Sequence, residues 1–243
     1  MNILITGGTS GLGKATVELL AKDSDHTVYF TYLDTETYRA AAERITACFH
    51  NTHSIPLNFC NDEDVDNFCE WIKTADIDVL VNSAYVGAPQ SNHFHKIKAD
   101  EFLKSFQSNL IPTIKITQAA IEVMRKKKFG KIINIITSYV MNLPPTGFAT
   151  YVGNKAYLEK MSDVINKEYV KFNITSNCIL PEFMNTGFGN VDERLVEQAE
   201  MTHPLKKLLV PEEVAQTVKF FVDAPQQVNG VKLPINAAMY INN

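Results

Sequence analysis

Residues 3–14 read ILITGGTSGLGK, which is a short apolar run followed by a glycine-rich turn and the first residues of a helical pattern. The glycines of the turn are Gly7, Gly8, Gly11 and Gly13. Backbone amides at a helix N-terminus attract an anion, and glycines leave no side chain in its way. The stretch therefore predicts a strand, a phosphate-binding turn and a helix.

A competing interpretation of this turn is a nucleoside-triphosphate loop, because Gly8 and Gly13-Lys14 have the spacing of that motif. Such a loop continues with Ser or Thr, whose hydroxyl holds magnesium, whereas this chain has Ala15. The apolar run 78–82 also ends in Asn82 rather than in a metal-binding aspartate. The sequence thus disfavours a phosphotransferase or an ATPase.

Short apolar runs alternate with helical patterns along the whole chain. Strands are expected at Ile3–Thr6, Thr27–Tyr32, His53–Asn58, Asp78–Asn82, Lys131–Thr137, Ile174–Ile179 and Val231–Ile235. Helices are expected at Leu12–Lys22, Thr35–Phe49, Asp62–Lys73, Lys98–Lys127 and Tyr151–Phe172, with a further polar helical stretch before Pro204. This alternation predicts a three-layer, doubly wound α/β fold with a parallel sheet. No Pro/Gly/Ser-rich linker interrupts it, so residues 1–243 are expected to form a single domain.

Composition narrows the class of protein further. The chain has 243 residues, of which 45% are apolar and 21% charged, as in ordinary globular proteins. A formal net charge of −4 gives no electrostatic basis for binding nucleic acid or an anionic membrane. No apolar run approaches the roughly 20 residues of a membrane span, and a cytoplasmic location is expected. The four cysteines form no C-x-x-C pair, and no metal site is expected.

A second group of residues carries the chemistry. Tyr151 and Lys155 are four residues apart, so they project from the same face of a helix. Ser138 follows a predicted strand and precedes Tyr151 by thirteen residues (151 − 138). A Y-x-x-x-K pattern occurs by chance on many helices, but its combination with this serine and the glycine turn is specific.

With these motifs the sequence resembles the short-chain dehydrogenase/reductase family over residues 3–238. Asn109 matches the family's catalytic asparagine, and Asn82 matches the end of its fourth strand. The segments PLKK (204–207), PEEVA (211–215) and NAA (236–238), with Gly230, are similar to its 3-oxoacyl-carrier-protein-reductase-like members. The resemblance implies a Rossmann-type fold and an enzyme that passes a hydride between a nicotinamide and a small-molecule carbonyl or secondary alcohol.

The resemblance also implies a role for each of four catalytic residues. Tyr151 would be the general acid or base, and the Lys155 cation would lower the pKa of that tyrosine and hold the nicotinamide ribose. Ser138 would hydrogen-bond the substrate oxygen and fix its approach. Asn109 would hold a water that connects the lysine to bulk solvent.

A nicotinamide cofactor is implied in turn, with NADP favoured over NAD. The residues expected to bind it are Gly7, Thr9, Ser10, Gly11, Leu12, Gly13, Tyr32, Asn58, Asn82, Ala84, Tyr151, Lys155, Pro181 and Thr186.

The choice between NADP and NAD depends on where the second strand ends. An acid at its tip would bind the ribose hydroxyls of NAD and repel the 2′-phosphate of NADP. In the preferred alignment Tyr32 takes that place, as in members that favour NADP, although Leu33 stands where those members have arginine. If the strand ends later, Asp34 is the acid and NAD is the cofactor, so NAD stays open.

Two departures from the family concern the substrate. Tyr85 and Glu182 replace glycines that follow the fourth and sixth expected strands, and the region 181–204 is expected to form the substrate loop. A 3-oxoacyl thioester, a sugar ketone and a secondary-metabolite ketone all stay open as substrates. An alternative is a non-catalytic dinucleotide-binding or sensing protein of the same fold. A homo-oligomer, dimer or tetramer, is expected through the helices at 98–127 and 151–172.

Overall fold

The computed structural model describes residues 1–89, 91–186 and 193–239, and within them seven parallel strands form one sheet. The strand order is β3-β2-β1-β4-β5-β6-β7. The strands are β1 (Asn2–Ile5), β2 (Thr27–Tyr32), β3 (Thr52–Pro56), β4 (Val79–Asn82), β5 (Gly130–Ile135), β6 (Ile174–Pro181) and β7 (Lys232–Ile235). The predicted three-layer, doubly wound α/β fold is confirmed.

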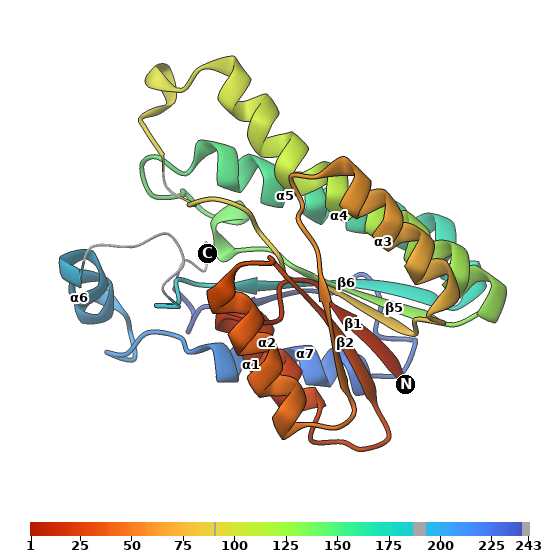
Figure 1. Cartoon of the computed structure of the whole chain (residues 1–243). Helices are drawn as coiled ribbons and strands as arrows, with labels where there is room; N and C mark the ends of the chain where they lie inside the picture. Colours follow the sequence, from red (N-terminus) through yellow and green to blue (C-terminus); the bar gives the residue numbers. More distant parts are fainter. Residues whose placement is uncertain (90, 187–192, 240–243) are drawn as a thin grey trace.

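Helices cover both faces of this sheet (Figure 1). One face carries α1 (Gly11–Leu20), α2 (Glu36–Cys48) and α7 (Pro211–Asp223), and the other carries α3 (Asp62–Thr74), α4 (Ala99–Lys127) and α5 (Ala149–Tyr169). The short helix α6 (Glu193–Thr202) lies apart from both layers. In the described part of the chain, no helix is long and apolar enough to cross a membrane.

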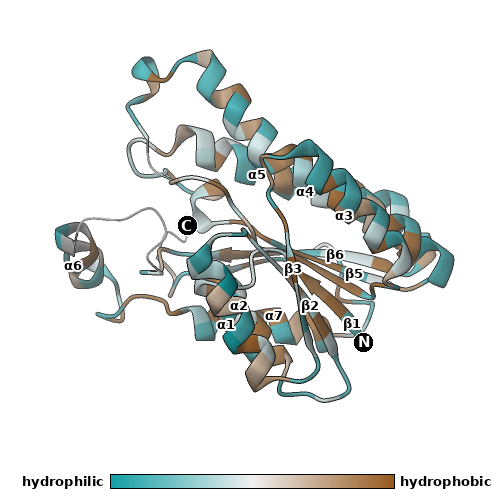
Figure 2. Cartoon of the chain, in the orientation of Figure 1, coloured by the Kyte–Doolittle hydropathy of each residue, from teal (hydrophilic) through white to brown (hydrophobic). Residues whose placement is uncertain are grey.

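The core consists of two main apolar layers, one on each side of the sheet. Val17, Phe30 and Phe221 are buried on the side of α1, α2 and α7. Phe68 and Met124 are buried on the opposite side, under α3 and α4. Because both faces are covered, the central strands β1 and β4 consist mostly of buried apolar residues, and the helices turn their hydrophilic sides outward (Figure 2).

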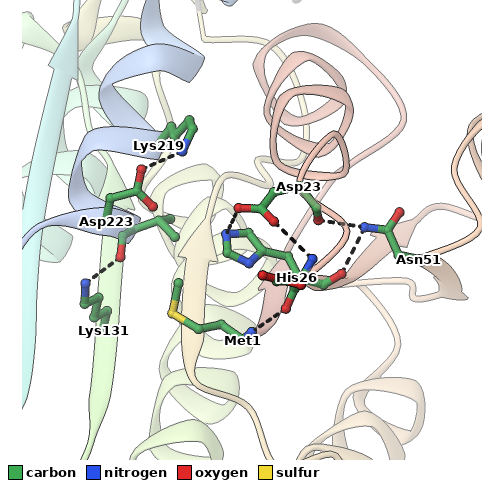
Figure 3. A network of polar contacts seen from close by, with 9 residues as sticks. Met1, Asp23, His26, Asn51, Lys131, Lys219 and Asp223 are labelled. Atoms are coloured by element: carbon green, nitrogen blue, oxygen red, sulfur yellow. Dashed lines mark hydrogen bonds and ion pairs between the residues drawn. The ribbon is translucent and has the colours of Figure 1, made fainter.

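Hydrogen bonds and ion pairs connect neighbouring segments at the end of the sheet where the strands begin (Figure 3). Lys131 lies at the start of β5 and is buried, and its ammonium donates to the backbone carbonyls of Val222 and Ala224 at the end of α7, the latter at 2.6 Å. Burial lowers the pKa of Lys131. The Asn51 side chain donates to the carbonyls of Asp23 (3.1 Å) and His26 (2.9 Å). These contacts hold connections at the end of the sheet opposite the glycine turn.

At the carboxyl ends of the strands, the strand order reverses between β1 and β4. The chain leaves these two neighbouring strands in opposite directions, and open α/β sheets bind ligands in the crevice so formed. The Thr6 hydroxyl links the two segments, because it accepts the backbone N–H of Ser83 (3.0 Å) and of Ala84 (3.1 Å). The glycine turn is therefore fastened directly to the segment that follows β4.

Helix α7 was not predicted from the sequence. The local signals were present, since Pro211 occupies its first turn together with two glutamates. Several bounds also differ from expectation: β5 ends at Ile135, β6 continues to Pro181, and α5 begins at Ala149 and ends at Tyr169, before a 3₁₀ turn over Val170–Phe172.

Candidate active site

The glycine turn has no room for side chains where the chain packs against itself. A Cβ on Gly13 would lie 2.0 Å from the carbonyl oxygen of Gly7, and both Gly7 (φ +74°) and Gly11 (φ +48°) adopt left-handed conformations. Helix α1 follows Ser10 with no side-chain cap and with no acidic residue in its first turn. Its N-terminal amides therefore suit an anion such as the diphosphate of a dinucleotide.

Two other predicted cofactor residues border this turn. A Cβ on Gly7 would lie 3.0 Å from the Cα of Ala84, which follows β4. A Cβ on Gly11 would lie 3.2 Å from the Cβ of Thr186, which follows β6. The structure thus brings Ala84 and Thr186 against the glycine turn.

Other predicted cofactor residues have their side chains engaged elsewhere. The Leu12 side chain is buried in the apolar layer beneath α1, so only its backbone borders the turn. Pro181 ends β6 and pairs with Ile235 of β7. The Asn58 side chain accepts the backbone N–H of Cys60 (2.9 Å) and so closes the turn after β3.

Asn82 begins a chain of buried hydrogen bonds across the sheet. Its amide nitrogen donates to Thr117 Oγ1 (3.1 Å) and to Asn134 Oδ1 (2.9 Å), and Asn134 donates in turn to Ser176 Oγ (3.3 Å). The structure therefore places both N–H groups of Asn82 in contacts that join β4, β5 and α4.

The tip of β2 carries a charge pair. β2 ends at Tyr32, which is the strand end that was expected to favour NADP. Asp34 lies two residues beyond it. The Arg39 guanidinium contacts the Asp34 carboxylate, with Nη2 at 2.7 Å and Nε at 2.9 Å from Oδ1. Sequence reasoning missed Arg39, because it belongs to α2 and its approach to Asp34 depends on how that helix begins.

Tyr151 and Lys155 lie together on one face of α5, and Tyr85 lies against both. The Lys155 ammonium is buried, donates to the carbonyl of Ile135 (2.7 Å), and lies 5.8 Å from the centre of the Tyr151 ring. The rings of Tyr85 and Tyr151 meet edge to face with their centres 5.0 Å apart. The Tyr85 hydroxyl is hydrogen-bonded to the side chains of Ser105 and Asn154.

Burial shifts both titratable groups of this pair toward their neutral forms. It lowers the pKa of Lys155 to about 8. It also raises the pKa of Tyr151, although a hydrogen bond with Thr137 opposes the shift. The direction for Tyr151 is opposite to the expected lowering by Lys155, because loss of hydration, and after it the neighbouring Tyr85, raises the pKa of Tyr151. At neutral pH the Tyr151 hydroxyl accordingly retains its proton.

Ser138 contacts a carboxylate. It opens a short 3₁₀ turn, Ser138–Val140, after β5, and its side chain is completely buried. Its hydroxyl donates to Oε2 of Glu182, which follows the end of β6 and is itself 8% exposed. The sequence singled out Glu182 as unusual but could not show this contact, which depends on β5 and β6 being neighbours.

Asn109 fastens the segment that carries Tyr85. Its Oδ1 accepts the backbone N–H of Val86 (2.6 Å), and its Nδ2 donates to the Val86 carbonyl (3.2 Å). The same nitrogen also lies 3.1 Å from the carbonyl of Ser105, one turn earlier in α4. All four predicted catalytic residues therefore lie on elements that meet beyond the carboxyl ends of β4, β5 and β6.

Part of the expected substrate loop at 181–204 lies outside the described residues, namely 187–192. Within the described ranges, Met184 forms an isolated parallel bridge with Leu209, which connects the start of this region to the segment before α7. In those same ranges, no group of three or more His, Cys, Asp or Glu side chains could hold a metal ion.

The fold, the glycine turn and the Tyr-x-x-x-Lys face define a dinucleotide-binding α/β protein with ionisable side chains at its crevice. The sequence profile described as "short chain dehydrogenase" matches residues 1–194. The chain belongs to the short-chain dehydrogenase/reductase family. It is accordingly an oxidoreductase of a family that uses NAD(P) and acts on small molecules.

Curated relatives and solved structures agree with this assignment. The chain is 30% identical to the 3-oxoacyl-[acyl-carrier-protein] reductase FabG of Haemophilus influenzae over 245 residues, which cover 98% of each chain. It is 29% identical to FabG of Aquifex aeolicus, with 98% of this chain and 96% of that one covered. A solved short chain dehydrogenase/reductase family protein has a TM-score of 0.83 at 26% identity, covering 98% of this chain and 96% of that one. YwfH, an NADPH-dependent reductase involved in bacilysin biosynthesis, shares the fold with a TM-score of 0.87 at 20% identity, covering 100% and 99%.

The close approach in the glycine turn can be tested with Gly13→Ala. The added Cβ would meet the Gly7 carbonyl, so the turn must shift, and overpacking of this kind costs about 1–3 kcal/mol. We expect affinity for NADPH and NADH to fall by about tenfold or more, measured by titrating nicotinamide fluorescence.

A matched control is Gly153→Ala on α5, where an added Cβ meets nothing within 4 Å. In this exposed helix position alanine should stabilise the fold by up to about 1 kcal/mol in urea unfolding and leave cofactor affinity unchanged. Equal cofactor affinity in wild type and Gly13→Ala would contradict the importance of the close approach.

Proposed function

We propose that the protein is an NADPH-preferring ketone reductase in which Tyr151 is the general acid. The observation that carries the proposal is the placement of Tyr151 and Lys155 on one helix face at the crevice that the glycine turn borders. The turn fits a dinucleotide, and the bound nicotinamide supplies the hydride. Proton donation and the positioning of the substrate are carried out by side chains of this protein.

The proton comes from Tyr151. Because burial raises the pKa of Tyr151, its hydroxyl is protonated at neutral pH and can donate to the carbonyl oxygen as the hydride reaches the carbonyl carbon. Lys155, whose pKa burial lowers to about 8, carries its charge below that pH and stabilises the phenolate that forms. Lys155 is also the group proposed to hold the ribose hydroxyls.

Ser138 and Asn109 position the reacting groups. Ser138 would contact the substrate oxygen from the end of β5, opposite the Tyr151 hydroxyl. Asn109 completes the set, and its two bonds to Val86 keep Tyr85 against Tyr151 and Lys155. Asn109 would also hold a water that connects Lys155 to bulk solvent.

The preference for NADPH rests on the tip of β2. Tyr32 ends the strand, and Asp34, the acid that would favour NAD, is paired with Arg39. The pairing offsets the charge of Asp34 and leaves further guanidinium donors for a 2′-phosphate. NAD is the alternative if Asp34 turns to the ribose.

The substrate class is a ketone, and the similarity to the FabG reductases makes a 3-oxoacyl thioester one candidate. The second candidate function is a dinucleotide-binding protein without turnover, which the bulky Tyr85 and the ionisable Glu182 favour. Hydride transfer decides between the two.

Tyr151→Phe should abolish reduction and preserve cofactor binding. Removing the proton donor is expected to lower kcat by about 10²–10⁴-fold, measured as NADPH oxidation with a panel of ketones that includes acetoacetyl-CoA. NADPH affinity should change by less than about twofold, since the ring and its packing remain. Tyr157→Phe, at an exposed tyrosine on the same helix, is the control. Wild type that binds NADPH but reduces no ketone would support the binding protein instead.

Arg39→Ala should shift the choice of cofactor. Loss of the guanidinium frees the Asp34 carboxylate beside the ribose, so NADPH affinity is expected to fall by about tenfold while NADH affinity holds or rises. Arg44→Ala, an exposed arginine farther along α2, should change neither. If Arg39→Ala binds NADPH as wild type does, the assignment of Arg39 is wrong.

A homo-oligomer through α4 and α5 completes the proposal. Both helices expose apolar side chains, namely Leu103, Tyr157 and Val164. Burial of such side chains against a second copy would form an isologous interface. Light scattering at micromolar concentration should give two or four times the mass of one chain, and Val164→Asp should lower that mass. The mass of a single chain for wild type would refute the proposal.

A further inference from the structure

Glu182 competes with the substrate for the Ser138 hydroxyl. Ser138 is completely buried, and its hydroxyl donates to the Glu182 carboxylate. A serine hydroxyl carries one hydrogen, and an ionised carboxylate and a carbonyl oxygen are both acceptors only. One hydrogen therefore cannot serve the carboxylate and the substrate at the same time.

A carboxylate displaced from Ser138 needs another donor. Glu182 is 8% exposed, and a buried carboxylate that loses its hydrogen-bond partner is strongly destabilised. Its own backbone N–H is already used by the carbonyl of Ile235 (3.0 Å). Among the described residues, no ion pair involves Glu182, and the Lys155 ammonium donates to the Ile135 carbonyl.

The reaction itself adds to this difficulty. Negative charge develops on the substrate oxygen as the hydride arrives, and a neighbouring carboxylate opposes that charge. A hydrogen-bond donor placed between the two would relieve both the lost bond and the repulsion. The substrate is the natural source of this donor, because it arrives as the carboxylate is displaced.

We propose, on the basis of the proposed reductase function, that the substrate is a ketone with a hydroxyl or ammonium group on the carbon next to the carbonyl, and that Glu182 binds this group. The displaced carboxylate and the substrate oxygen that takes its place as acceptor both lie next to the Ser138 hydroxyl, so they are within about 5 Å of each other. A donor on the adjacent carbon spans that distance. A plain 3-oxoacyl chain offers only methylene groups and acceptors there, so Glu182 selects against it.

Matched ketones test the inference directly. 1-Hydroxy-2-butanone and 3-pentanone have the same number of heavy atoms and differ by a hydroxyl in place of a methyl group. Wild type is expected to prefer the hydroxyketone by about 100-fold in kcat/KM, since a site built to bind a substrate hydroxyl rejects an analogue without one. In Glu182→Gly the ratio should fall below about fivefold, with faster reduction of 3-pentanone.

Glu182→Gln keeps the shape of the side chain and removes its charge. It should retain part of the preference for the hydroxyketone, because the amide oxygen still accepts, and lose most of the preference for 1-amino-2-butanone, whose donor is a cation. Glu212→Gln, at an exposed glutamate on α7, should leave all ratios unchanged.

Equal turnover of the hydroxyketone and 3-pentanone by wild type, or a preference that Glu182→Gly leaves intact, overturns the inference and leaves the proposed reductase function unaffected. Failure of the proposed function has a different signature, in which wild type and both Glu182 variants transfer hydride to no ketone. A preference that Glu182→Gly removes and Glu182→Gln partly retains supports a direct bond between the carboxylate and the substrate donor.

Discussion

The reversal of strand order between β1 and β4 is the constraint on which the candidate site depends. All seven strands are parallel, so their carboxyl ends share one edge, and the reversal opens that edge into a crevice. The Thr6 hydroxyl holds the two diverging segments together by accepting the N–H groups of Ser83 and Ala84. The glycine turn can then pack against Ala84 and Thr186 with no side chain between them.

Burial is the second constraint, and it acts on the electrostatics of the site. Lys155 and Tyr151 are both removed from water, which favours their neutral forms and brings the pKa of the lysine close to neutral pH. The Lys155 ammonium keeps a backbone acceptor at Ile135 and lies against two aromatic rings. A proton donor with a raised pKa beside an easily discharged cation suits carbonyl reduction, in which the tyrosine must first hold its proton and then release it.

The sequence predicted the features that local patterns determine. Fully buried parallel strands appear in a sequence as apolar runs, and two residues four positions apart share a helix face. The sheet and the Tyr151–Lys155 pair could therefore be predicted. Contacts between distant segments were not. The Asp34–Arg39 ion pair depends on the start of α2, and the Ser138–Glu182 bond depends on β5 and β6 lying side by side. Strand and helix ends were displaced by one to three residues because local propensity changes gradually where a ladder or a helix ends.

The two departures from the family pattern act on the two sides of the proposed reaction centre. Tyr85 packs against Tyr151 and Lys155, and Glu182 accepts a hydrogen bond from Ser138, so each of the two side chains contacts a different catalytic candidate. Both new side chains have hydrogen-bond partners, Tyr85 with Ser105 and Asn154 and Glu182 with Ser138. Because a buried polar group without a partner destabilises the fold, these contacts explain how the fold accommodates both side chains. Under the proposed reductase function, Glu182 exchanges its partner during the reaction: a hydrogen-bond donor of the substrate replaces the Ser138 hydroxyl as that hydroxyl turns to the carbonyl oxygen.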